Sequence, residues 1–423
     1  MPRILFRLLG VLLTPLVVCA ADPTKPGSYD WPQWQGQDRS AVSKEKDLLE
    51  KWPDKGPTLL WSVATLGGGY STPSIAAGRI FGMGARDEDE GVWALSEADG
   101  KELWWTRIAA KLTKKEAGYA EGPRCTPTVD GDVLYVLGMS GALVCLKVAT
   151  GELVWQKNLV KDFNGRVGGW KYAESPLIDG ERLLVTPGGE KATIVCLNKK
   201  TGDTIWLSKV PGGKGGSNEA AYSSLVAANV EGQKQYIQFL SGNVVGIAAE
   251  DGKFLWRYNG RFPGIVCSTP VYFDSQVYAA ASYSKGGGAV RLTREGDEVK
   301  ATEVFFDQKY QNHHGGLVLI DGYLYGEGSS NLVCIEFKTG KEMWREKSAG
   351  KGSIAAADGK LYYRNERGPI YLVDVNPEKY VQRGKFDQPE RSGQAAWPHP
   401  VIANGKLYIR DQEKLFVYDV KRR

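Results

Sequence analysis

The sequence has few of the residues that metal and redox sites use. Among 423 residues there are six cysteines and three histidines, and no two cysteines form a Cys-x-x-Cys pair. That absence removes the usual support for a zinc ribbon, a thioredoxin-type centre or c-type haem attachment. The formal net charge of +5 at pH 7 is small for this length, so composition gives no reason to expect a nucleic-acid partner.

Long apolar runs are absent after the first residues of the chain. Residues 1–21 have the composition of an export signal, with Arg3 and Arg7 before an apolar stretch from Leu8 to Val18 and small residues at a cleavage site. The stretch is short and interrupted by a glycine and a proline, so we expect no transmembrane span in the mature chain. The protein is therefore expected to be exported, to the periplasm or the extracellular space.

The cysteines suggest neither a lipid anchor nor a disulfide framework. Cys19 follows the bulky Val18, whereas lipid attachment usually needs small residues before the cysteine, so no anchor is expected there. Five cysteines remain after removal of the signal, and Cys145, Cys196 and Cys334 occupy matching apolar runs. Equivalent positions of different repeat units are not expected to meet, which predicts buried free thiols.

What the chain does contain is a tryptophan at a nearly fixed step. Four residues after the glycine of a tight turn, a tryptophan recurs at Trp104, Trp155, Trp206, Trp256 and Trp344. The steps between them are 51, 51, 50 and 88 residues, and the last corresponds to two shorter steps. A fixed period of this length indicates a repeat architecture, in which no single unit can bury its apolar face alone.

Each unit has the pattern of a four-stranded antiparallel meander. In residues 126–136, two alternating strands flank an Asp-Gly turn, and two further strands precede Trp155. Counting Phe305, Phe386 and Trp61 as outer-strand aromatics gives eight units, with one short helix near residues 111–116. Four-stranded units at this period close radially, which predicts an all-β, eight-bladed β-propeller.

The ends of the chain are expected to complete one blade together. The C-terminal residues supply three strands, so we predict that Leu59–Val63 lies beside Leu415–Val420 and closes the ring without a covalent link. The expected organisation is a signal peptide at 1–21, an N-terminal segment at 22–57 and a single propeller at 58–423, present as a monomer. Structural roles between blades are expected for the outer-strand tryptophans Trp61, Trp104, Trp155, Trp206, Trp256 and Trp344.

Two segments resemble a known repeat family. Residues 195–206 and 333–344 are similar to the pyrroloquinoline-quinone (PQQ) repeat, which builds the eight-bladed propellers of quinoprotein alcohol dehydrogenases and of the envelope lipoprotein BamB. The segments 31–36, 187–190 and 311–316 also resemble a secreted, PQQ-like branch common in planctomycete-type bacteria. The resemblance implies the fold, but the repeat serves both enzymes and scaffolds.

Resemblance to the dehydrogenases would imply PQQ, a calcium site of Glu, Asn and Asp, an aspartate base and usually two adjacent cysteines. This chain has no adjacent cysteines, and only Glu190, in Gly188-Gly189-Glu190, is similar to the family's calcium-binding glutamate. We therefore expect no catalytic residues and no cofactor. A PQQ- and calcium-dependent alcohol or sugar dehydrogenase is the alternative.

A ligand site is expected at the rim of the central channel, just before the innermost strands. The candidate residues there are Tyr70, Arg124, Glu174, Tyr222, His313, His314, Lys351 and His399, with Trp397 nearby. Convergent polar groups at a concave centre favour binding, although histidines at strand starts can also serve only to bind neighbouring loops.

No metal is expected at this rim. Consecutive residues of an extended chain point to opposite faces, so His313 and His314 are not expected to bind one ion together. Glu174 is the only carboxylate predicted at the rim, whereas a carbohydrate-processing module would need a pair. The favoured function is non-catalytic binding or scaffolding in the bacterial envelope, with a protein, peptide or polysaccharide as partner.

Overall fold

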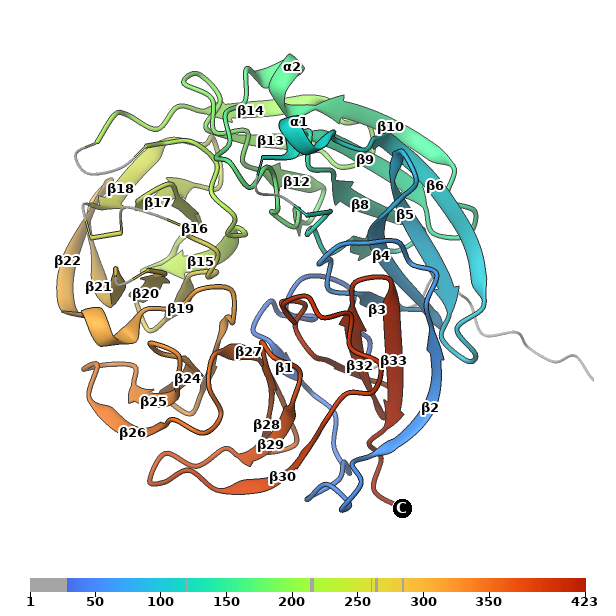
Figure 1. The fold of residues 1–423 in the computed structure, drawn as a ribbon. Coiled ribbons are helices and arrows are strands. Elements are labelled where there is room, and N and C mark those ends of the chain that lie inside the picture. Colours follow the sequence, from blue (N-terminus) through green and yellow to red (C-terminus); the bar gives the residue numbers. More distant parts are fainter. Residues whose placement is uncertain (1–28, 119–120, 214–216, 260, 263–264, 284) are drawn as a thin grey trace, which may run out of the picture.

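The computed structural model describes residues 29–118, 121–213, 217–259, 261–262, 265–283 and 285–423. The predicted signal peptide and Cys19 lie outside the described residues. Eight sheets stand around a central channel (Figure 1), so the predicted eight-bladed, all-β propeller is confirmed. Seven sheets have four strands, and the remaining one has a fifth strand from the N-terminal segment.

Each blade runs outward from the channel along the chain. The first blade consists of β3 Ser74–Ala76, β4 Arg79–Arg86, β5 Asp89–Ser96 and β6 Glu102–Ala110. The second consists of β7 Thr128–Asp130, β8 Val133–Leu137, β9 Ala142–Lys147 and β10 Leu153–Asn158. The third consists of β11 Leu177–Asp179, β12 Arg182–Val185, β13 Ile194–Asn198 and β14 Thr204–Ser208. The fourth consists of β15 Val226–Val230, β16 Gln233–Leu240, β17 Asn243–Ala248 and β18 Phe254–Tyr258.

The second half of the ring follows the same order. The fifth blade consists of β19 Val271–Phe273, β20 Gln276–Ala281, β21 Gly286–Glu295 and β22 Glu298–Asp307. The sixth consists of β23 Leu317–Ile320, β24 Tyr323–Glu327, β25 Leu332–Glu336 and β26 Glu342–Glu346. The seventh consists of β27 Gly352–Ala357, β28 Lys360–Asn365, β29 Ile370–Asp374 and β30 Gln382–Phe386, with β1 Val42–Ser43 beside β27. The eighth consists of β2 Thr58–Val63, β31 Val401–Ala403, β32 Lys406–Asp411 and β33 Lys414–Asp419.

The eighth blade closes the ring as predicted. The N-terminal strand β2 pairs antiparallel with the C-terminal β33, with Leu59 opposite Tyr418 and Val63 opposite Leu415. In Figure 1 the blue β2 lies along the red β33. Closure is therefore non-covalent, and the outer edge of the last blade depends on a strand from the other end of the chain.

The outer-strand tryptophans lie against the following blade. A Cβ on Gly151 would come within 2.6 Å of the Trp104 ring, and one on Gly202 within 3.0 Å of the Trp155 ring. The Trp104 indole donates to the Val148 carbonyl at 3.0 Å, also in the following blade. Trp61, Trp104, Trp155 and Trp206 thus pack on the turn glycine of the next unit, whereas Trp256 packs on Gly246 of its own blade.

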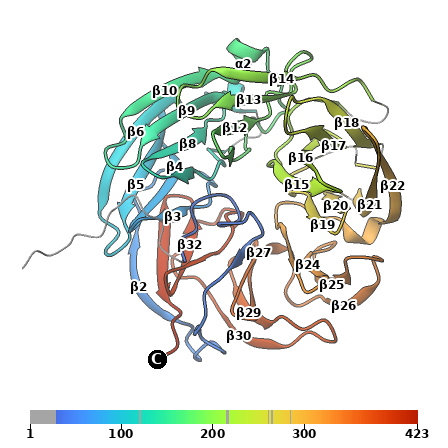
Figure 2. The ribbon, with the colours of Figure 1, turned by 180° about the vertical axis from the view of Figure 1, so that it is seen from behind.

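The N-terminal segment enters the channel. Pairing links Trp31 to Ile75 of β3; the Pro32 carbonyl accepts from the Val129 amide of β7, and the Ala41 carbonyl accepts from the Ala356 amide of β27. Figure 2 shows the blue N-terminal segment running through the middle of the ring beside β27. We call residues 31–41 the channel segment, and it ties the innermost strands of three separate blades together.

Helices are few and short in the part of the chain that the structure describes. They are α1 Lys114–Ala117, α2 Leu159–Phe163 and the single 3-10 turn η1 Gln308–Tyr310. Thr113 and Glu116 form a capping box on α1. None of the described helices is long and apolar enough to span a bilayer.

Two sequence expectations about side chains have different outcomes. Cys145, Cys196 and Cys334 are buried free thiols, as predicted, and the other two described cysteines are also unpaired. The charged run Arg86-Asp87-Glu88-Asp89-Glu90 predicts a solvated loop tip, with a calcium site as the alternative, and the prediction of a solvated tip is wrong for Glu90. That side chain lies on β5, is fully buried, and accepts from the Met139 amide of the next blade at 3.0 Å.

Candidate functional site

A pocket lies at the centre of the ring, where the innermost strands begin. Its lining is mainly aromatic, and it consists of Trp34, Tyr70, Thr72, Arg124, Trp170, Ala173, Ser175, Tyr222, Ser224, Ile265, Cys267, His313, His314, Trp397 and His399. The pocket has a volume of about 100 Å³, which is about three times the roughly 30 Å³ that a water molecule occupies in the liquid. It can therefore take one ring-sized group.

The channel segment lies between this pocket and the opposite end of the channel. Trp34 lines the pocket, packs on His399 at 4.7 Å between ring centroids, and donates to the Thr269 hydroxyl at 2.9 Å. Its neighbours Gln33 and Gln35 instead line a separate depression, together with residues further along the innermost strands. Trp34 therefore forms the inner end of the central pocket.

Six of the eight candidate residues line this pocket: Tyr70, Arg124, Tyr222, His313, His314 and His399. Lys351 lies next to it, in an adjacent depression that shares His313. Glu174 does not line the pocket. Its side chain is 2% exposed and lies between the third and fourth blades, where it accepts from Thr186 and from Gln238 of β16.

A rule of alternation explains which residues reach the pocket. The residue three positions before the proline that opens an innermost strand lines the pocket in every such case, as Trp397 does before Pro400, and the residue one position before lines it at Pro73, Pro176 and Pro400. The residue two positions earlier points into the blade, because successive side chains of extended chain alternate. Glu174 occupies that position before Pro176, which accounts for its burial.

Arg124 is the cation of the pocket. Its guanidinium lies 5.5 Å from the Tyr70 ring centroid and 5.4 Å from that of Trp170, within the range of cation–π attraction. Its Nη1 donates to the Gly122 and Trp170 carbonyls. Its Nη2 is buried, and no group of the described residues accepts a hydrogen bond from it. Burial lowers the pKa of Arg124 from its ordinary value.

The three histidines form the opposite wall. The chain bends at His313 and His314, so their Nδ1 atoms lie 3.5 Å apart instead of on opposite faces. The His399 ring contacts the His314 carbonyl through Nε2 at 2.8 Å, so the two residues meet across two blades. Burial lowers the pKa of His313 and of His399 to about 4 and that of His314 well below its usual range, so all three rings are neutral at pH 7.

Two carboxylates that sequence reasoning missed lie behind this wall. Glu366, in the turn after β28, accepts from the Trp397 indole at 2.7 Å and from Lys351 at 3.1 Å. Glu327, at the end of β24, is almost fully buried and accepts from the His313 amide at 2.9 Å. Glu366 belongs to a hairpin turn rather than to a strand start, so the search for residues before strands could not find it.

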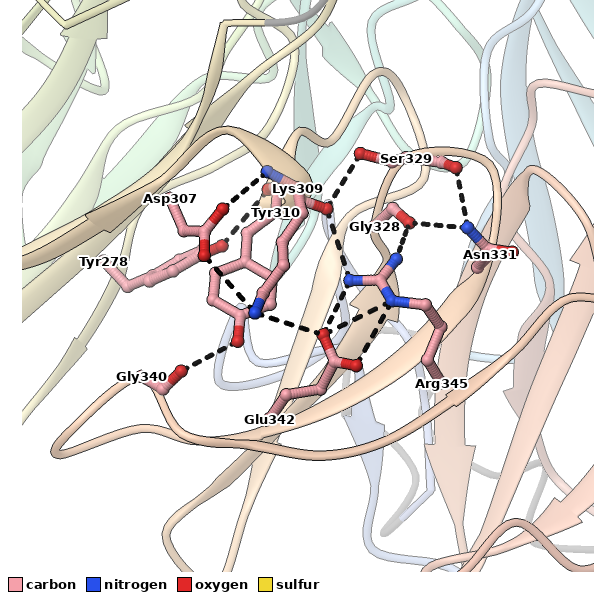
Figure 3. A network of polar contacts seen from close by, with 10 residues as sticks. All are labelled: Tyr278, Asp307, Lys309, Tyr310, Gly328, Ser329, Asn331, Gly340, Glu342 and Arg345. Atoms are coloured by element: carbon pink, nitrogen blue, oxygen red, sulfur yellow. Dashed lines mark hydrogen bonds and ion pairs between the residues drawn. The ribbon is translucent and has the colours of Figure 1, made fainter.

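Figure 3 shows the contacts around η1, the turn that directly precedes His313 and His314. Tyr310 donates to the Gly340 carbonyl at 2.8 Å, and Arg345 donates to the Gly328 carbonyl at 2.7 Å and pairs with Glu342 at 2.8 Å. Ser329 donates to the Lys309 carbonyl at 2.8 Å. The bonds of Tyr310 and Ser329 link η1, which follows the fifth blade, to the sixth blade and fix the start of the segment that carries His313 and His314.

Trp34, Trp170 and Cys267 are further pocket residues that the candidate set lacked. Cys267 stands three positions before Pro270, so the alternation described above would have found it. Trp34 belongs to the N-terminal segment and Trp170 to a long connection before β11. Neither has a periodic pattern that places it, and only their aromatic character in polar, glycine-rich surroundings marks them.

The pocket does not fit calcium-bound PQQ. None of the described residues that line it is a carboxylate, and Cys267 is its only cysteine, so the paired thiols are missing. Glu190, the candidate calcium ligand, is exposed and pairs with Arg166 at 3.2 Å. The residues present thus supply neither the calcium ligands nor the ring platform of a quinoprotein site.

Comparison with known proteins identifies the family and supports the fold. The family profile described as outer membrane protein assembly factor BamB matches residues 31–113 and 105–346. BamB of Shewanella oneidensis is 23% identical over 383 residues, which is 84% of this chain and 86% of that protein.

Solved structures agree on the fold. BamB from Moraxella catarrhalis has a TM-score of 0.58 at 14% identity, with 86% of this chain and 98% of that chain covered. Quinohemoprotein alcohol dehydrogenase from Comamonas testosteroni has a TM-score of 0.66 at 12% identity, with 96% and 84% covered. The family profile covers well over half of the sequence, and the chain therefore belongs to the family of the outer membrane protein assembly factor BamB.

Proposed function

We propose that this protein is an exported, non-catalytic binding propeller of the bacterial envelope, within the secreted branch that its sequence motifs resemble. Its central pocket seats one ring-sized side chain of a partner protein or peptide. The observation that carries this proposal is an aromatic pocket with one unpaired guanidinium nitrogen, Arg124 Nη2. The name of the family, an outer membrane assembly factor, favours an envelope protein as the partner.

The pocket has the chemistry of a recognition site. Tryptophan and tyrosine rings supply large contact areas and add about 0.5–1.5 kcal/mol per aromatic pair beyond burial. A buried guanidinium donor without an acceptor is costly, so a ligand carboxylate or carbonyl at Arg124 restores a charge-assisted hydrogen bond. An aromatic or apolar side chain next to a backbone or terminal oxygen meets both conditions.

The side chains in the pocket also favour binding over catalysis. The one sulfur nucleophile is Cys267, and burial raises the pKa of its thiol to about 12, so it is protonated at neutral pH. The described lining residues include no carboxylate, and burial lowers the pKa of each of the three histidines far below neutral pH, which makes them weak general bases. Hydrogen bonds from the Trp34 and Trp397 indoles to Thr269 and Glu366 hold these rings in place, which lowers the entropy lost on binding.

The proposal is tested with N-acetyl-L-tryptophan, a probe that combines an indole with a carboxylate. Binding to the mature chain is measured by calorimetry and by ligand NMR. Arg124→Met should weaken binding by about tenfold to a hundredfold, because a hydrogen bond to a charged group contributes about 1.5–3 kcal/mol. Arg107→Met, which changes an exposed arginine on β6, should leave binding unchanged.

Other outcomes decide between the alternatives. Binding of neutral oligosaccharides with no binding of the probe would favour a polysaccharide partner. Tight binding of PQQ with calcium, followed by dye reduction with alcohols, would favour the dehydrogenase alternative. Equal probe affinity in Arg124→Met and the unchanged protein would exclude Arg124 as the recognition group.

A further inference from the structure

A cluster of two imidazoles and one carboxylate stands at the wall of the central pocket. His313, His314 and Glu366 each offer a ligand atom, and these atoms lie within 4.8 Å of one another. The two histidines come from the bend before β23 and Glu366 from the turn after β28, so the sixth and seventh blades both contribute. Neither the family profile nor the proposed binding function requires this cluster.

The spacing of the two rings suits a single ion. Their Nδ1 atoms are 3.5 Å apart. Two nitrogens bound at the usual zinc distance of about 2.0–2.1 Å in tetrahedral geometry are about 3.3–3.4 Å apart. The measured separation is therefore close to a chelating one, and the bend of the chain provides it without any ion.

One oxygen of the Glu366 carboxylate is available to bind a metal ion. The Trp397 indole and the Lys351 ammonium both donate to Glu366 Oε1, at 2.7 and 3.1 Å. Those bonds hold the carboxylate in place and leave Oε2 without a hydrogen bond to any residue in the described parts of the chain. A ligand whose other oxygen is already hydrogen-bonded is oriented in the way that metal sites usually require.

We propose that His313, His314 and Glu366 bind a divalent transition-metal ion, with Zn²⁺ as the best fit. Two imidazoles and a carboxylate suit zinc, copper or nickel and do not suit the oxygen-loving Ca²⁺ or Mg²⁺. Three protein ligands leave a fourth position of the tetrahedron for water or a ligand group, at the wall of the aromatic pocket. Such an ion gives the pocket a second electrophilic centre besides Arg124.

Charged groups around the cluster affect how tightly it should bind a metal ion. Lys351 lies beside Glu366 and competes with a cation for it, and Arg364 adds positive charge near His314. The acid that offsets them at His313 is Glu366 itself, whereas burial raises the pKa of Glu327, which accepts from the His313 amide. Removal of the Lys351 charge should therefore tighten metal binding, which is the reverse of what a purely structural Lys351–Glu366 pair predicts.

The cluster is held in place before any ion binds. Glu327 fixes the His313 amide, and the His399 ring contacts the His314 carbonyl at 2.8 Å. The contacts of η1 in Figure 3 hold the preceding turn. Little chain entropy is therefore lost when the three ligands converge on an ion.

The test is zinc binding by the mature chain without a polyhistidine tag, after treatment with a chelator. Calorimetry with ZnCl₂ and metal analysis after dialysis should show one ion per chain, and Co²⁺ should give the visible absorption of a tetrahedral site. His313→Ala and Glu366→Gln should each weaken zinc binding at least tenfold, whereas Lys351→Met should strengthen it about tenfold. Glu121→Gln is the matched control, because this carboxylate binds Tyr70 at the far side of the same pocket.

Circular dichroism of each variant establishes that it is folded before affinities are compared. A dissociation constant weaker than about 100 μM for the unchanged chain overturns the proposal. It is also overturned if Glu366→Gln binds zinc as tightly as the unchanged chain. These results are independent of the tryptophan-probe experiment, so the two proposals can fail separately.

Discussion

At the scale of single residues, the turn glycines meet two separate demands. Gly252 has a φ of +76° and Gly232 a φ of +85°, and both lie in turns of the fourth blade. Around Gly232 there is no atom within 4 Å of an added Cβ, whereas at Gly252 that atom would lie 2.5 Å from the Trp206 ring. Gly232 is required only for its backbone conformation. Gly252 is required for its conformation and also leaves space for Trp206 of the neighbouring blade.

This pair of glycines allows the inter-blade contact to be measured. Gly232→Ala should cost about 1–2 kcal/mol, the penalty of a side chain in the left-handed region. Gly252→Ala should cost about 1–3 kcal/mol more, because the added methyl group forces the Trp206 ring out of its position. Urea unfolding followed by circular dichroism compares the stabilities of the two variants. Equal unfolding midpoints would contradict a stabilising contact between Trp206 and Gly252 of the next blade.

The sequence could predict where the tryptophans fall but not which glycine each one touches. Spacing relative to Gly202 fixes Trp206 on an outer strand, yet the ring lies on Gly252 of the following unit. The order of units along a chain does not state which side of a blade faces which neighbour. In the same way, Glu174 was correctly placed near the start of a strand, but a shift of one residue along extended chain reverses the direction of the side chain.

At the scale of elements, the strand β2 closes the ring by pairing with β33 from the other end of the chain. Its partner β33 ends the chain, and the register places Thr58 opposite Asp419. The sequence predicted this pairing because the C-terminal unit had three strands and Trp61 had no unit of its own. A count of strands was enough, since a ring without an open edge admits one solution.

A covalent link at this junction should stabilise the whole ring. Thr58→Cys with Asp419→Cys places the two thiols on paired residues, near the exposed end of the strand pair. The disulfide would close a very long loop, for which the entropy model gives up to about 5 kcal/mol. Oxidised and reduced forms are compared by thermal unfolding, with each single cysteine variant as a control. No rise in Tm on oxidation, despite formation of the bond, would show that this strand does not limit unfolding.

The channel segment shows what element-level reasoning could not supply. Its bridge pairing is limited to Trp31 with Ile75, the two-residue strand β1 follows directly after it, parallel to β27, and its path through the channel is irregular. Irregular backbone leaves no hydrophobic period to detect. The sequence therefore predicted a segment leading into the ring, while the closing of the pocket by Trp34 came only from the three-dimensional arrangement.

At the scale of the whole molecule, ring closure stacks the blades face to face and buries polar groups between them. Glu90 of the first blade is fully buried against the second, with Oε1 bound to the Met139 amide and Oε2 without a partner among the described residues. Burial raises the pKa of this carboxyl to about 7. In the unfolded chain it titrates near 4.5, so the folded ring holds an extra proton between the two values.

That extra proton makes the contribution of Glu90 depend on pH. Where the native state binds more protons than the unfolded state, the free energy of unfolding falls as pH rises. From about pH 4.5 to pH 7, Glu90 should therefore lower the stability progressively, by up to about 3 kcal/mol, and by a constant amount above that. Because His313, His314 and His399 have lowered pKa values, their contribution rises with pH over a similar range and opposes this trend.

The two trends are separated by Glu90→Gln, which stays neutral at every pH. Relative to the unchanged chain, the variant should gain up to about 3 kcal/mol between pH 5 and pH 8, whatever the histidines contribute, because they are present in both proteins. Glu88→Gln, an exposed position in the same hairpin, should show no such gain. The measurement is the midpoint of urea unfolding for each variant and for the unchanged chain at pH 5 and at pH 8. A difference that stays constant with pH would mean that Glu90 is ionised in the folded ring and that the first two blades admit water at their interface.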